Sequence, residues 1–128
     1  MKKIIIALFT LLLFQNCCFS AEWKEVSYKT YIDMSSWHYK NGYSYAWVKS
    51  LNDGTKKPIN GQQVWFSLNK FKIDCTNGKL GIVNYIDYGL KGQVLDSFTP
   101  VEINMFEVAP ESRGEILHEY VCGKRTYY

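Results

Sequence analysis

The sequence predicts an α+β domain in which an antiparallel β-sheet meander carries one C-terminal helix. Aromatic residues make up 16% of the chain, and they alternate with β-branched and polar residues over short stretches, which is typical of strands. Turn signals such as Asn77-Gly78 separate these stretches at hairpin spacing. A capping box followed by an apolar stripe at helical spacing occurs near the C-terminus and indicates a helix packed on the sheet.

The first half of the domain is predicted to be extended. Residues 23–31 favour two short strands, and residues 43–49 favour a longer one. The alternating positions of the longer strand share one face: Tyr43, Tyr45, Trp47 and Lys49. Residues 53–62 form the most polar stretch, so we expect a loop there.

The longest predicted strand covers residues 63–75. Apolar side chains occur at both odd and even positions, so we expect this strand in the centre of the sheet, with both faces at least partly covered. Asn77-Gly78 then favours a type I′ turn, because Asn and Gly tolerate positive φ. Residues 80–88 complete the hairpin, and residues 93–98 add a third strand to the meander.

The C-terminal part supplies the helix. Residues 101–109 are predicted to cross one end of the core in an extended conformation. Ser112 and Glu115 have the spacing of a capping box, and Gly123 stands where a helix ends. Four apolar side chains form one stripe of the predicted helix: Ile116, Leu117, Tyr120 and Val121.

Residues 1–20 have the pattern of a secretory signal peptide. Two lysines follow Met1, residues 4–14 form an apolar run, and small residues precede a predicted cleavage site before Ala21. An uncleaved membrane anchor would need about 20 apolar residues, which is longer than this run. Acylation at Cys17 is a second alternative, although bulky residues precede that cysteine.

The mature chain is predicted to be nearly neutral. Loss of Lys2 and Lys3 lowers the net charge from +3 to +1, because all 12 acidic residues remain. Such a balance gives no field that would favour nucleic acid or an anionic membrane as the partner. We also expect no transmembrane segment in the mature chain, and an exported protein in the periplasm or at the outer cell surface.

The cysteines predict a disulfide. Cys17 and Cys18 leave with the signal peptide, so Cys75 and Cys122 are the thiols left in an oxidising compartment. Their bond closes a loop of about 48 residues, which corresponds to about 4 kcal/mol of stabilisation by chain entropy. It would tie the last turn of the helix to the end of the long strand.

Enzyme signatures are missing from the sequence. His38 and His118 are the two histidines of the chain and have no metal-ligand spacing, and neither a G-x-S-x-G nor a phosphate-loop motif occurs. We interpret Asp33, Asp74 and Asp87 as solvated or turn-capping carboxylates and His118 as a solvated side chain. The sequence therefore predicts a protein without catalysis, cofactor or metal.

Taken in order, several short motifs resemble the surface-adhesin protein E family of Gram-negative bacteria, from about Trp23 to Cys122. No single piece is specific, but their order and spacing together are. They are Trp23, Tyr31-Ile32-Asp33 with the following Ser pair, Ala46-Trp47-Val48, Asp74-Cys75, the stretch 85–94, Val108-Ala109-Pro110 with Ser112, and Val121-Cys122.

The resemblance implies an antiparallel sheet with a C-terminal helix fastened by a disulfide, at the cell envelope or surface. Known members of the family are adhesins that bind host extracellular-matrix or serum proteins such as vitronectin, laminin and plasminogen. Homodimers are known among them. A protein partner, and a homodimer, are therefore expected for this chain as well.

The sequence thus predicts an exported, non-catalytic protein-binding domain in the class of adhesins; the alternative is a soluble periplasmic envelope or inhibitor protein of unknown ligand. Two segments are candidate partner contacts, the loop 53–62 with Lys56 and Lys57 and the tail with Lys124 and Arg125. Tyrosines near loops or the terminus could add contact area: Tyr39, Tyr43, Tyr45, Tyr127 and Tyr128. The competing structural interpretation assigns four aromatic side chains to the core: Trp47, Trp65, Phe66 and Phe71.

Overall fold

The structure is a computed structural model that describes residues 20–123. The predicted signal peptide, apart from Ser20, and the basic tail with Lys124 and Arg125 lie outside the described residues. Within them, no helix is long and apolar enough to cross a membrane.

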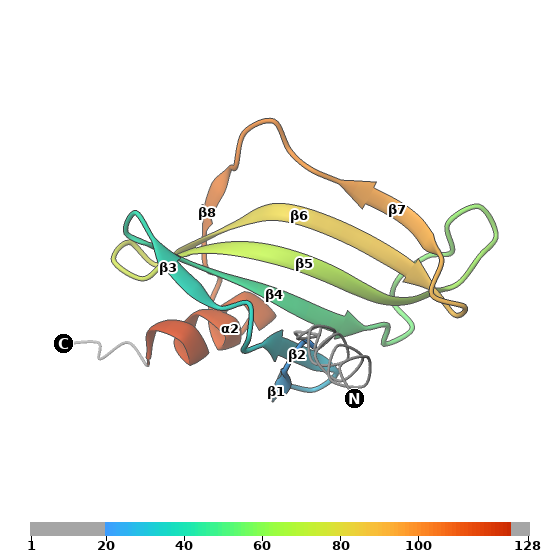
Figure 1. Cartoon of the computed structure of the whole chain (residues 1–128), viewed down its shortest axis with the longest axis horizontal. Helices are drawn as coiled ribbons and strands as arrows, with labels where there is room; N and C mark the ends of the chain where they lie inside the picture. Colours follow the sequence, from blue (N-terminus) through green and yellow to red (C-terminus); the bar gives the residue numbers. More distant parts are fainter. Residues whose placement is uncertain (1–19, 124–128) are drawn as a thin grey trace, which may run out of the picture.

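One antiparallel sheet of eight strands forms the body of the domain, with the order β1-β2-β4-β5-β6-β7 (Figure 1). β3 continues the line of β2 along β4, and β8 continues the line of β7 along β6. The predicted central position of β5 is confirmed. The strands are β1 Trp23–Ser27, β2 Thr30–Asp33, β3 His38–Lys40, β4 Tyr43–Leu51, β5 Val64–Asp74, β6 Lys79–Gly89, β7 Val94–Phe98 and β8 Met105–Glu107.

The predicted type I′ turn at Asn77-Gly78 is wrong. The loop between β5 and β6 comprises residues 75–78, and of its residues Gly78 alone has positive φ. The Asp74 carboxylate accepts hydrogen bonds from the backbone N–H groups of Thr76 and Asn77, and this Asx interaction sets the turn instead. A two-residue turn with positive φ at both positions lies at Asn41-Gly42, between β3 and β4.

Strand pairing divides the side chains between two faces, because directly paired residues share a face and successive residues alternate. We call the face that packs against the helix the helix face. Ala46 pairs with Phe71, and Ile73 pairs with Leu80 on this face. The core cluster consists of Ile32, Ala46, Val48 and Leu117, the last from the helix. The opposite face of β4, β5 and β6 is called the open face.

The predicted helix is α2, Arg113–Cys122. Ser112 caps it by accepting a hydrogen bond from the Glu115 N–H, while the Glu115 carboxylate accepts from the Glu111 N–H rather than from that of Ser112. Gly123, at φ 83°, ends the helix, as expected for a residue that tolerates positive φ. In Figure 1 the chain runs from β7 over an arch to β8, at the β6 side of the sheet, and then back to α2 beside β1.

The four aromatic residues assigned to the core by the structural interpretation separate in the structure. Phe71 packs against the core cluster. Trp65 is 54% exposed, while Trp47 and Phe66 are half-buried and their register places them on the open face. The core is therefore built from aliphatic side chains, and most of the large rings lie outside it.

Candidate functional site

Aromatic rings and lysines gather on the open face. On β4 this face carries Tyr43, Tyr45, Trp47 and Lys49, the alternation that the sequence predicts. Their partners on β5 and β6 add Phe66, Leu68, Lys70, Lys72, Ile86 and Tyr88. Two stacked pairs order the rings, His38 with Tyr45 at 5.2 Å and Phe66 with Tyr88 at 4.7 Å between centroids.

Two of these lysines lie over ring faces. The Lys49 ammonium is 4.6 Å from the Trp23 ring centroid and 5.6 Å from that of Tyr31. The Lys72 ammonium is 3.9 Å from the centroid of Tyr43. Such cation–π contacts hold an ammonium in place without neutralising its charge.

Carboxylates are scarce on the open face. Across β4, β5 and β6 the register places one acidic residue there, Asp74 at the end of β5, and its oxygens accept hydrogen bonds within the 75–78 loop. In residues 20–123 the ion pairs are Lys56–Asp87 and Arg113–Asp53. Lys49, Lys70 and Lys72 therefore have no carboxylate partner among the described residues.

The helix face has its own feature, an apolar hollow of about 430 Å³ beside the N-terminus of α2. Ile82 and Phe106 line it and also line a smaller hollow of about 190 Å³ below the arch, together with Phe98. Phe98 and Phe106 are 59% and 48% exposed. This region is a second surface on which a partner's apolar side chains could lie.

A polar cluster fastens the 53–62 loop to the helix face. The Lys56 ammonium donates hydrogen bonds to Ser67 Oγ at 2.6 Å, to Asp87 Oδ1 at 2.7 Å and to the Tyr85 hydroxyl at 3.0 Å. Ser67 and Tyr85 also donate to the Asp87 carboxylate. Asp87, 3% exposed, is thus satisfied on both oxygens, and the interpretation of Asp87 as a solvated or turn-capping carboxylate is wrong.

The charges of this cluster stabilise each other. Burial tends to raise the pKa of Asp87, but the hydrogen bonds from Lys56, Ser67 and Tyr85 outweigh it and hold that pKa below its ordinary value. Burial tends to lower the pKa of Lys56, but the hydrogen bonds to Asp87 and Tyr85 raise it. Lys56 therefore stays protonated, so it cannot act as a base toward Ser67.

The predicted partner contacts fall into different settings. The Lys56 ammonium is engaged inside the molecule, as described above, whereas Lys57 is exposed on the same loop. Lys124 and Arg125 lie outside the described residues. Tyr43 and Tyr45 lie on the open face, and Tyr39 is 73% exposed on the edge strand β3.

The same loop also contacts α2. Arg113 donates a hydrogen bond to Asp53 at 2.6 Å. Hydrogen bonds from Thr55, followed by the contact with Arg113, lower the pKa of Asp53 to about 2. The loop therefore joins the start of the helix to the β5–β6 strands, and it is attached at two points.

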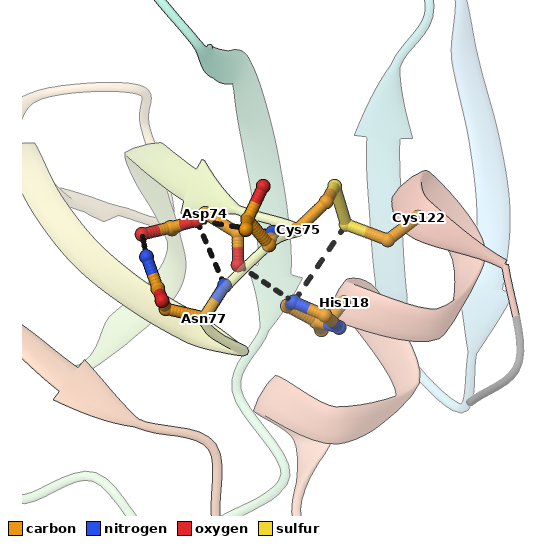
Figure 2. Close-up of a disulfide and its surroundings, with 6 residues drawn as sticks. Asp74, Cys75, Asn77, His118 and Cys122 are labelled. Atoms are coloured by element: carbon orange, nitrogen blue, oxygen red, sulfur yellow. Dashed lines mark hydrogen bonds between the residues drawn. A yellow bond between two sulfur atoms is a disulfide. The ribbon is translucent and has the colours of Figure 1, made fainter. Parts of the chain in front are cut away.

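Figure 2 shows the predicted Cys75–Cys122 disulfide, which is confirmed, with Cα atoms 5.4 Å apart. His118 lies below it, 2% exposed, so the expectation of a solvated histidine is wrong. Its Nε2 is 3.1 Å from the Asp74 carbonyl oxygen and 3.7 Å from Cys122 Sγ. Because a carbonyl oxygen only accepts, Nε2 carries a proton and donates it to this bond.

Two of the three carboxylates singled out from the sequence cap turns, as predicted. Asp33 accepts from Ser35 and from the Glu22 N–H; burial works to raise its pKa, but these hydrogen bonds lower it. Hydrogen bonds from the Asn77 side chain and N–H lower the pKa of Asp74. Among residues 20–123 no group of three or more His, Cys, Asp or Glu side chains could hold a metal ion.

The sequence interpretation missed Lys70 and Lys72, which lie in the centre of the open face. Their signal was present: two lysines at alternating positions within an otherwise apolar strand share a face and cannot both point into a core. The Lys56–Asp87 cluster had no comparable signal. Lys56 and Asp87 are 31 residues apart, and only the fold brings them together.

These features define a small β-sheet binding module with a disulfide-fastened helix on one side and an aromatic, lysine-bearing face on the other. The sequence model of surface-adhesin protein E matches residues 21–123. The chain therefore belongs to the surface-adhesin protein E family, and the resemblance seen in the sequence is confirmed.

Solved structures of Haemophilus influenzae protein E share the fold. The structure of its crystal form II is 17% identical in sequence to this chain, with a TM-score of 0.55. The match covers 73% of this chain and 80% of the protein E chain. A structure from non-typeable Haemophilus influenzae is 15% identical, with coverages of 83% and 78% and a TM-score of 0.56. No curated protein matches the sequence.

Proposed function

We propose that this chain is a surface adhesin, an exported domain without catalytic activity that binds a host extracellular-matrix or serum protein through its open face. One observation carries the choice of surface: rings and lysines cover β4, β5 and β6 on the side where no helix of the described residues packs. Exposed Tyr and Trp side chains supply large, rigid contact area at protein interfaces. Membership of the adhesin family supports the class of function.

The size of the open face suits a protein partner. The three strands of this face lie about 4.8 Å apart, and the central one, β5, has 11 residues at about 3.4 Å per residue, which gives about 540 Å². A standard interface buries about 800 Å² on each partner. The open face therefore supplies most of one such interface.

Capture of matrix and serum proteins by the purified mature protein tests this function. Tyr45→Ala should weaken binding about tenfold, because Tyr45 stands among the open-face rings and central interface aromatics carry most of the binding energy. Phe98→Ala removes a more exposed ring, 59% accessible, from the helix face and should leave binding unchanged.

The opposite pattern, with Phe98→Ala losing the partner, would move the site to the apolar hollow. No capture at micromolar protein would refute the adhesin function.

Two measurements bear on location and assembly. Added protease should remove the protein from whole cells if it is held at the surface, and full protection would favour the periplasmic alternative. Mass spectrometry of the mature N-terminus distinguishes cleavage before Ala21 from acylation at Cys17. Light scattering of the purified protein tests the homodimer by its mass.

A further inference from the structure

Three lysines form an oblique row across the middle of the open face. Lys72 and Lys70 are two residues apart on β5. Lys70 pairs with Trp47 of β4, so Lys49 is its diagonal neighbour. Successive residues on one face of a strand are about 6.8 Å apart, and diagonal neighbours are about 7–8 Å apart. The lysine positions of the row therefore repeat about every 7 Å along the sheet.

The lysines of the row are restricted in conformation and keep their positive charge, which favours binding of an anion. Lys49 and Lys72 lie against rings of Trp23, Tyr31 and Tyr43, which restricts their side chains before any partner arrives and lowers the entropy cost of binding. Their charges are not neutralised by any carboxylate of residues 20–123, whose ion pairs involve Lys56 and Arg113.

The repeat of the row equals the repeat of an extended peptide. Alternate side chains of an extended chain point to one side about 6.8 Å apart. Resting on the proposed function, we propose that the open face binds an extended segment of the partner protein in which acidic residues alternate with small or apolar ones. Each carboxylate contacts one lysine, and the rings between the lysines cover the intervening backbone.

A protein segment fits these observations better than nucleic acid or a membrane. Nucleic-acid sites gain affinity from many phosphate contacts and a strong positive field, whereas this row has three lysines and the mature chain carries a predicted net charge of +1. The rings of the face are the side chains enriched in protein interfaces.

The test uses two synthetic peptides of about ten residues and identical composition. One alternates Glu with Thr, and the other has the same Glu residues in one block. Calorimetric titration of the purified protein should show tighter binding of the alternating peptide, and Lys70→Gln/Lys72→Gln should weaken it about tenfold. Raising the salt from about 0.05 M to about 0.5 M should weaken it as well.

Lys24→Gln/Lys91→Gln is the matched control. Lys91 is exposed in the loop between β6 and β7, and Lys24 is exposed on β1, where it pairs with Ile32 of the helix face. This variant loses the same net charge outside the row and should bind the alternating peptide as the wild type does. Thermal unfolding checks that both double variants fold.

Several outcomes would overturn the inference. They are equal binding of the two peptides, equal losses in the two double variants, or equally strong, lysine-dependent binding of heparin, single-stranded DNA or anionic vesicles. The inference and the proposed function fail separately. If a captured host protein depends on Tyr45 but not on Lys70 and Lys72, the adhesin function stands without the acidic segment. If the alternating peptide binds but no host protein is captured, the binding of an acidic segment stands and the adhesin function fails.

Discussion

Loss of the disulfide gives the most direct quantitative prediction. The bond joins residues 47 apart in sequence, and closing a loop of this length removes chain entropy from the unfolded state worth about 4 kcal/mol at 25 °C. For a domain of about 100 residues, each kcal/mol shifts the melting temperature by about 4–8 °C. Cys75→Ser and Cys122→Ser should therefore each lower it by about 15–30 °C.

The structure adds a reason to expect a loss of this size. α2 contributes Leu117 to the core cluster and His118 to a hydrogen bond with the Asp74 carbonyl. A helix of 10 residues is marginal without tertiary contacts. Without the bond, α2 is held on the sheet by its side-chain packing and by the hydrogen bonds of Arg113 and His118 alone.

Thermal unfolding followed by near-ultraviolet circular dichroism measures the effect. Because both cysteines lose the same bond, the double variant should be no less stable than either single variant, and a reducing agent should affect only the wild type. Additive losses in the double variant, a loss below about 1 kcal/mol, or a titratable Cys75 or Cys122 thiol in the native protein would refute the reasoning.

Three further predictions concern the sheet and the helix. Lys56→Met should cost about 2 kcal/mol, because the buried Asp87 carboxylate loses its cation while Ser67 still donates to it; urea unfolding measures this. The folded-state pKa of Asp87 is below its ordinary value, so this stabilisation is complete above about pH 4 and declines as the pH falls through the folded-state pKa. The difference in the free energy of unfolding between wild type and Lys56→Met should therefore become smaller in this acidic range. A difference that does not change with pH would contradict the role of Asp87. Gly81→Ala should cost about 1–3 kcal/mol, since the new Cβ would lie 2.6 Å from the sulfur of Met105, and an unchanged melting temperature would argue against this close approach. Ser112→Ala should cost about 1 kcal/mol through the lost cap, and a wild-type melting temperature would argue against the role of the cap.

The limits of the sequence interpretation lie where distant residues meet. Local residue preferences predict a type I′ turn at Asn77-Gly78. The Asp74 carboxylate instead accepts hydrogen bonds from the backbone N–H groups of Thr76 and Asn77, so the loop is longer. His118 reads as solvated because nothing near it in sequence covers it. It is buried because the disulfide brings α2 against the end of β5.

The residues themselves determine the strands, the helix with its Ser112 cap, and the pairing of Cys75 with Cys122, because alternation, capping and a thiol count are local or compositional properties. Tertiary structure decides the use of the charged side chains. The chain has 15 basic residues. The fold brings the partly exposed Lys56 ammonium against the buried Asp87 carboxylate, and strand pairing aligns Lys49, Lys70 and Lys72 on the open face. Burial and register depend on contacts across the sheet, which no single stretch of sequence contains.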